Sequence, residues 1–160
     1  MSNTIIGVRL TETYTSAALT AAGYTVGQVF TNYDGKVYKL YLFNNGAGNV
    51  AAVSGNVAYL YAVSGASAGQ TNTCTMDLTD TQEIGAGVFQ SVPADGEYCW
   101  LQIKGHATLT TALTAGADGD PLTPTGSTDG TLDVVTAATD AVCAYAIDAS
   151  AKIVMCDFPY

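Results

Sequence analysis

The chain has 160 residues, of which only 12% are charged: five Lys and Arg against fourteen Asp and Glu, for a net charge of −9. So little charge excludes coiled coils and helical bundles, and five cations cannot build the basic face of a nucleic-acid-binding protein. The hydrophobic share of 48% excludes a disordered chain, and the length suits one domain with a real core.

The N-terminal sequence lacks the basic segment and the apolar segment that form a secretion signal. Residues 40–76 carry no charge, but Asn and Gly interrupt them every few residues. A helix that spans a bilayer needs about 20 predominantly apolar residues. We therefore expect neither membrane nor nucleic acid among the partners of this chain.

In chain order, residues 13–22 are the only segment with a helical pattern, although Thr dilutes its helix propensity. Asp34-Gly35 follows, between runs rich in β-branched and aromatic residues at 24–30 and 37–43, and this pattern predicts a β-hairpin. A connection or one helical turn is expected over 77–84. Further short strands, separated by Gly, Pro and Asp turns, are predicted at 57–63, 74–78, 85–92, 97–104, 107–113, 131–135, 142–147 and 152–158.

Residues 97–104 alternate, which predicts Tyr98 and Trp100 on one face of a strand and Cys99 and Leu101 on the other. We interpret residues 104–108 as a turn between two strands. About nine short strands at this spacing predict a mainly β fold, as a single compact antiparallel β-sandwich or small β-barrel with little helix.

The residues that could carry catalysis or bind a metal form no recognisable motif. His106 is the only imidazole and no nucleophile-elbow sequence accompanies it, so a hydrolase is the weakest hypothesis. Oxygen ligands for calcium occur in one region, but without EF-hand spacing and beside glycines, where Asp commonly caps turns. These residues are Asp118, Asp120, Asp129 and Asp133. We expect no catalytic site, metal or cofactor.

The four cysteines lack any CxxC pairing, which disfavours zinc: Cys74, Cys99, Cys143 and Cys156. Buried free thiols are the expected state, because Cys commonly behaves as a small hydrophobic residue. If disulfides form, Cys143 and Cys156 are the first pair to test.

Many of the ten tyrosines fall in predicted strands: Tyr38, Tyr41, Tyr59, Tyr61, Tyr98 and Tyr145. Aromatic stripes on a sheet can stack on sugars, fill a core or anchor a protein interface. The first use would make the chain a glycan-binding module, and the stripe alone does not separate the three.

The sequence GEYCWLQIKGHAT at 96–108 follows the pattern Gly-x-Tyr-x-Trp-x-Gln-x-x-Gly-x-Ala. Glycine-rich and aromatic segments follow at 117–122, 129–131 and 144–146, and the segments VGQVF and DGKVYK precede it at 26–30 and 34–39. In this order they resemble the small capsid decoration (cement or head-stabilising) proteins of tailed bacteriophages, loosely over residues 24–160.

The resemblance implies a structural, non-enzymatic virion protein that is assembled in the host cytoplasm and placed on the capsid exterior. Residues 24–160 would form a β-rich decoration domain that binds the major capsid protein lattice as a homo-oligomer, a trimer or a dimer. Residues 1–23 would form an extended N-terminal arm on a neighbouring capsid subunit. The capsid-contact candidates are Ile5, Ile6, Val8, Arg9, Leu10 and Tyr14, and Tyr98 and Trp100 are interface or core aromatics. The alternative is a glycan- or surface-binding β-module of a phage head or tail fibre.

Overall fold

The computed structural model describes residues 8–61 and 72–159, and within them the protein is mainly β, as predicted. One α-helix, α1 (Ser16–Ala22), and one 3-10 turn, η2 (Leu78–Asp80), accompany ten strands. The strands are β1 (Val29–Thr31), β2 (Val37–Phe43), β3 (Val57–Tyr61), β4 (Thr73–Thr75), β5 (Thr81–Phe89), β6 (Tyr98–Thr108), β7 (Pro121–Thr123), β8 (Asp133–Val134), β9 (Ala144–Asp148) and β10 (Ile153–Asp157).

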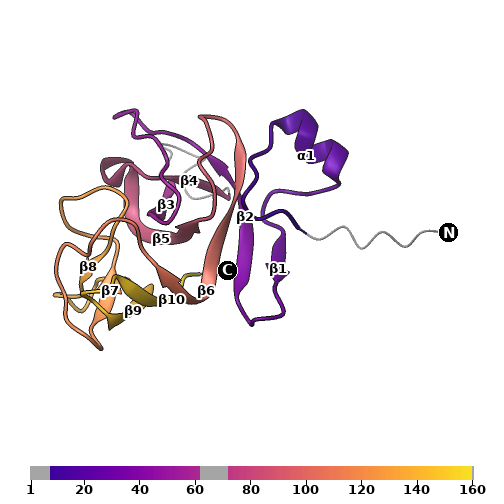
Figure 1. The fold of residues 1–160 in the computed structure, drawn as a ribbon. Coiled ribbons are helices and arrows are strands. Elements are labelled where there is room, and N and C mark those ends of the chain that lie inside the picture. The colour runs from indigo at the N-terminus through magenta and orange to yellow at the C-terminus, as the bar shows by residue number, and fades with distance from the viewer. Residues whose placement is uncertain (1–7, 62–71, 160) are drawn as a thin grey trace.

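The ten strands form one hydrogen-bonded sheet in the order β1-β2-β4-β3-β5-β6-β10-β9-β7-β8 (Figure 1). β2 also pairs with β6, so the pairings β2–β4–β3–β5–β6–β2 close into a circuit. The pairs are antiparallel except β2–β4, which is parallel and differs from the purely antiparallel sheet expected. β1 and α1 lie at one end of the molecule, and β7, β8 and β9 at the other.

The paired strands β2 and β6 are buried on both faces. Tyr41 of β2 and Leu101 of β6 belong to one core cluster, whereas Leu40 and Trp100, their neighbours in sequence, belong to another. The alternation predicted for β6 is therefore confirmed, but both of its faces are apolar. The second cluster lies under α1 and the segment that precedes it, which contribute Leu19 and other side chains.

The helix α1 lies within the segment predicted to be helical and begins at Ser16. The Thr15 side chain caps its first turn by accepting a hydrogen bond from the Ala18 N–H at 3.3 Å. Gly23 ends it with φ +75°, and its N–H donates to the Thr20 carbonyl at 3.1 Å.

The predicted β1–β2 hairpin is present, with the Gly35 N–H donating to the Asn32 carbonyl at 3.0 Å across the turn. Its first strand is shorter than the predicted 24–30 and covers only Val29–Thr31. The cause lies at Gly27, which has φ +82°, and in a turn where the Gln28 N–H donates to the Thr25 carbonyl at 2.9 Å.

The turn predicted at 104–108 is wrong, because β6 continues through these residues and pairs with β10 along them. Gly105 accommodates the irregular backbone with φ +90°, and the Gln102 side-chain amide donates to the carbonyls of Lys104, Gly105 and His106. The strand predicted at 107–113 is also absent beyond Thr108. There the chain leaves the sheet, and the Thr110 N–H donates to the Gly55 carbonyl at 3.0 Å.

The remaining predicted strands are present with shifted ends. β5 begins at Thr81, inside the segment expected to be a connection, and η2 provides the helical turn expected there. The last two residues of the strand predicted at 57–63 lie outside the described residues. None of the described helices is long and apolar enough to span a membrane.

Candidate contact surfaces

The first candidate surface is the N-terminal segment that carries the predicted capsid-contact residues. Ile5 and Ile6 lie outside the described residues. Val8 and Leu10 are half-buried and pack against the cluster around Trp100. Arg9 between them is exposed, and its guanidinium lies 2.7 Å from a carboxylate oxygen of Glu12. The described part of the segment therefore turns its apolar side chains to the domain and its charged pair to solvent.

Tyr14 joins this segment to the sheet. Its N–H donates to the Tyr98 carbonyl at 2.9 Å, and the Tyr98 N–H donates to the Tyr14 carbonyl at 2.8 Å, as in an antiparallel bridge. The Tyr14 side chain is buried, and its hydroxyl donates to the Arg9 carbonyl at 3.1 Å. Burial raises the pKa of Tyr14 above its usual value. Residues 8–14 are thus held on the domain by backbone and side-chain contacts.

Trp100 lies at the centre of the cluster beneath this segment and is fully buried. The Tyr24 ring meets its ring edge-on at a centroid distance of 5.7 Å, and the Phe30 ring does so at 6.5 Å. The indole N–H interacts electrostatically with the Tyr14 hydroxyl, but it makes no hydrogen bond of standard geometry within the described part of the chain. In this structure Trp100 is a core residue that supports the N-terminal segment, and Tyr98 beside it is half-buried.

A second candidate surface was not anticipated from the sequence. We call it the hairpin face: the outer side of β9 and β10, which exposes the apolar residues Tyr145, Ile147 and Met155. Tyr145 lies directly opposite Met155 in the β9–β10 register, so the two side chains are cross-strand neighbours. The signal was present in the sequence Ala144-Tyr-Ala-Ile147, where the small residues face the core and the large ones face outward.

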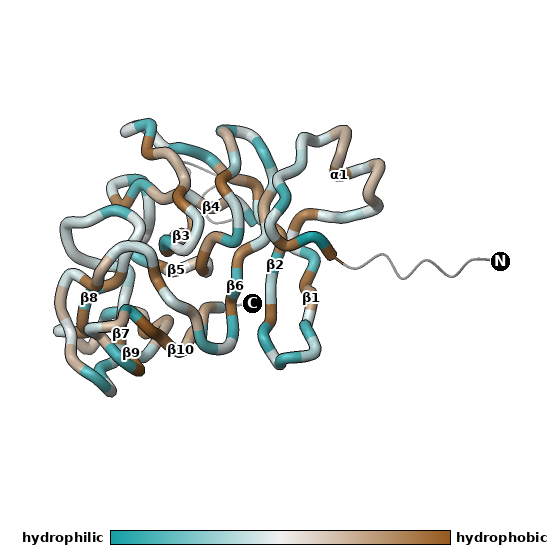
Figure 2. The backbone as a smooth tube through the Cα atoms, viewed as in Figure 1, coloured by the Kyte–Doolittle hydropathy of each residue, from teal (hydrophilic) through white to brown (hydrophobic). Residues whose placement is uncertain are grey.

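Figure 2 shows hydrophobic stretches at both ends of the molecule, around β9 and β10 and where the described chain begins near Val8. The N-terminal segment bonds to the start of β6 and the hairpin face belongs to β9 and β10, so the two candidate surfaces lie on different parts of the sheet.

His106 of β6 is exposed and lies directly opposite Met155 of β10, on the same side of the sheet as the hairpin face. Its neighbours on the same face of β6 are Lys104 and Thr108, and Asp157 lies diagonally across on β10. The backbone carbonyl of His106 accepts a hydrogen bond from the Gln102 side chain.

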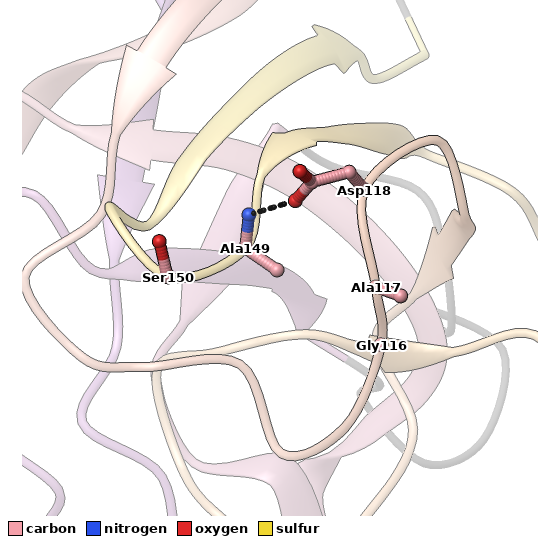
Figure 3. A pocket seen from close by; sticks show the side chains of 5 residues that line it. All are labelled: Gly116, Ala117, Asp118, Ala149 and Ser150. Carbon is pink, nitrogen blue, oxygen red and sulfur yellow. Dashed lines mark hydrogen bonds between the residues drawn. The ribbon is translucent and has the colours of Figure 1, made fainter.

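Each of the four carboxylates considered for calcium accepts a hydrogen bond from a backbone N–H. Asp118 accepts from Ala149 at 2.9 Å, Asp120 from Ala117 at 2.8 Å, Asp129 from Leu78 at 2.8 Å and Asp133 from Val134 at 2.7 Å. Figure 3 shows the Asp118 bond at the rim of an open depression lined by small side chains, Ala117, Ala149 and Ser150 among them. The described residues contain no group of three or more His, Cys, Asp or Glu that could hold a metal ion.

The four cysteines are buried as free thiols, which agrees with the burial predicted for them. Cys74 and Cys99 belong to the same core cluster, and their thiols interact. Cys143 and Cys156 lie in the cluster beneath the hairpin face. Burial raises the pKa of Cys156 to about 12, and it also raises the pKa values of Cys74 and Cys143.

The tyrosines do not form one exposed stripe. Tyr38, Tyr41 and Tyr59 are buried, so their rings are not available to stack on a sugar. The Tyr59 hydroxyl instead donates to the Thr131 carbonyl at 2.7 Å and accepts from the Thr131 N–H at 3.0 Å. Of the tyrosines in strands, Tyr145 on the hairpin face has an exposed side chain.

Comparison with known proteins identifies no relative: no protein-family model, no curated protein and no solved structure matches this chain.

Proposed function

We propose that this chain is a structural, non-enzymatic virion protein that binds the outer surface of an assembled phage capsid lattice. In this role it stabilises contacts between subunits of the major capsid protein and acts as a homo-oligomer. The observation that carries the proposal is the presence of two separate candidate contact surfaces on one domain, the N-terminal segment beside α1 and the hairpin face on β9 and β10. A molecule with two separate contact surfaces can bridge two neighbours.

The hairpin face has the chemistry of a protein contact. Tyr145, Ile147 and Met155 form an exposed apolar group, and contiguous apolar surface on a folded protein commonly marks an interaction site. Tyr and Met are also enriched at protein interfaces.

The charge of the chain supports the same function. Most of the acidic residues, Asp34, Asp95, Asp118 and Asp140 among them, lie in turns and loops outside the strands. A neutral surface tolerates the close approach of protein neighbours, and an acidic protein on the shell exterior does not compete for the polyanionic genome.

Stabilisation of the shell then follows from mass action. A protein that binds only the assembled lattice shifts the assembly equilibrium toward it, and attachment at many lattice positions multiplies the effect.

The test is a binding experiment with purified heads and with unassembled capsid protein of the virus that encodes the chain. The proposal predicts saturable binding to heads, weak binding to free subunits, and a higher disruption temperature for decorated heads. A glycan array probed with the isolated protein serves as the control for the alternative. Saturable sugar binding without binding to heads would contradict the proposal.

A further inference from the structure

Strand β1 is at the edge of the sheet. It pairs with β2 on one side, through Val29 opposite Lys39 and Thr31 opposite Val37, and no other strand of the described chain pairs with its second side. Figure 1 shows β1 at the outer limit of the sheet, below α1. An edge of this kind presents unpaired backbone groups that can bind another strand.

Two hydrogen bonds to the β2 side, one just before β1 and one just after it, determine which backbone groups of β1 point outward. The Leu40 N–H donates to the Gln28 carbonyl at 2.9 Å, and the Asn32 N–H donates to the Lys36 carbonyl at 2.8 Å. In an antiparallel pair the residues alternate between those bonded to the partner strand and those directed away from it. Gln28 and Asn32 are bonded to β2, as is Phe30 between them, so the N–H and C=O groups of Val29 and Thr31 point away from the sheet.

Although β1 is short, this edge carries neither of the residue types that commonly protect an edge strand, a charged side chain or a proline. Residues 13–33 contain no charged residue and no proline. Large apolar side chains are exposed on and around β1: Val26 is 40% exposed, Val29 44% and Tyr33 100%. The Phe30 side chain lies on the opposite face of β1 and packs toward Trp100.

We propose that β1 pairs with β1 of a second copy of this chain, antiparallel and about a two-fold axis at Phe30. In this register Val29 of each copy lies opposite Thr31 of the other. The outward N–H and C=O groups of these two residues then bond to each other, and the sheets of the two copies become continuous.

The occupant is a second copy because the edge is complementary to itself. When a second copy of β1 runs antiparallel to the first, the outward backbone groups of Val29 in one copy face those of Thr31 in the other. Both residues have β-branched side chains, which favour cross-strand pairs. Charge favours the same site. Two molecules of net charge −9 repel each other. At β1 they meet through the uncharged residues 13–33; the nearest charged residues are Lys39, which lies opposite Val29 in β2, and Asp34 and Lys36 in the turn.

The inference rests on the proposed function in one respect: the proposed function includes a homo-oligomer, and β1 pairing would form it. Self-association is tested on the isolated protein, without capsids. A protein that does not self-associate could still bind capsids, and a protein that self-associates could fail to bind them.

The experiment measures self-association by sedimentation over a wide concentration range, for the native chain and for three variants. Val29→Lys places a charge on the outward edge. Thr31→Pro removes an outward N–H and spares the bonds to β2. Val142→Lys is the matched control, because Val142 is almost equally exposed, at 43%, but far from β1. We expect the first two to raise the dissociation constant about tenfold or more, since each change occurs twice in a two-fold contact, and the control to leave it unchanged.

Hydrogen exchange locates the contact. The Val29 and Thr31 amides should become protected only at concentrations where the protein associates, whereas the Phe30 amide should be protected at all concentrations. A chain that stays monomeric, or a dimer that forms equally well with Thr31→Pro, would overturn the proposal. Protection of these amides on capsids alone would overturn it as well, because it would make a capsid strand the occupant.

Discussion

Tyr14 and Tyr98 exchange two backbone hydrogen bonds, of 2.9 and 2.8 Å, and so attach the N-terminal segment to the start of the longest strand. From Tyr14 onward the segment is part of the folded domain, because its side chain is buried beside Trp100. Residues 1–7 lie outside the described residues. The capsid-contact role proposed for the N-terminus can therefore be tested apart from the packing of residues 8–14 on the domain.

The first prediction concerns deletion of residues 1–7, which removes Ile5 and Ile6 but keeps Val8, Leu10 and Tyr14. We expect the free energy of unfolding in urea to stay within about 0.5 kcal/mol of the native chain, since Val8, Leu10 and Tyr14 keep their packing in the cluster around Trp100. We also expect the number of copies bound per head to fall.

Deletion of residues 1–12 is the comparison, because it also removes the packing of Val8 and Leu10. It should lower both stability and binding. Unchanged occupancy of heads after either deletion would contradict a capsid-contact role for this segment.

The second prediction concerns Trp100. Trp100→Ala empties a fully buried site between Tyr24 and Phe30 and should cost about 3–5 kcal/mol of unfolding free energy. Trp100→Phe should cost clearly less, because an aromatic ring is kept and the indole N–H has no hydrogen bond of standard geometry to lose. Urea unfolding followed by circular dichroism measures both, and a similar cost for the two variants would contradict this account of the site.

The third prediction concerns alkaline pH. Burial raises the pKa values of Cys74, Cys143 and Cys156, so these thiols stay protonated in the folded state after they ionise in the unfolded chain, at about pH 8.5. The unfolded state then binds fewer protons, and stability falls as pH rises. Each thiol contributes up to about 1.4 kcal/mol per pH unit above that point.

Urea unfolding under reducing conditions, from about pH 7 to 9.5, measures this slope. Cys156→Ala should make it shallower, whatever that variant does to stability at neutral pH. A native chain whose stability does not change across this range would show that the thiols are not buried as described.

The fourth prediction concerns Asp77, whose buried carboxylate accepts hydrogen bonds from the Gly48 N–H at 2.8 Å and the Thr79 N–H at 2.9 Å. Burial by itself raises the pKa of this carboxyl, but the hydrogen bonds outweigh it and lower the pKa below its usual value. The stabilisation is therefore present above the pKa of the unfolded chain, about 3.9, and is lost as pH falls through the lower folded value.

Asp77→Asn should cost about 1–3 kcal/mol at neutral pH and weaken the acid dependence of stability. Asp118→Asn is the matched control, because Asp118 is exposed and should cost less than about 0.5 kcal/mol. Equal effects at the two positions, measured by urea unfolding at several pH values, would contradict a special role for Asp77.

The mainly β fold could be predicted because its signals are local. Asp34-Gly35 between two β-rich runs specifies a hairpin, and the alternation of residues 98–101 specifies a strand. The prediction was wrong where a local sequence pattern is compatible with two structures. Gly105-His106 suggests a turn in sequence, yet Gly105 is accommodated inside β6, where the Gln102 side chain binds the irregular backbone.

The surfaces were harder to predict than the strands. The attachment of Tyr14 to Tyr98 joins residues far apart in sequence, and no local pattern specifies it. The exposed pair Tyr145 and Met155 depends on the register of β9 with β10, which is set by the core residues on the other face. The free edge of β1 likewise follows from the strand order, which short strands of similar composition do not encode locally.

Density maps of the viral particle, recorded with and without this protein, test directly whether it decorates the capsid. A decoration protein gives additional density of about the size of this domain on the outer surface of the shell, at repeated positions between capsid subunits. Its N-terminal segment and its hairpin face should each contact a neighbouring protein. Shells that are identical with and without the protein, or density only inside the shell or on a tail fibre, would show that it does not bind the capsid exterior.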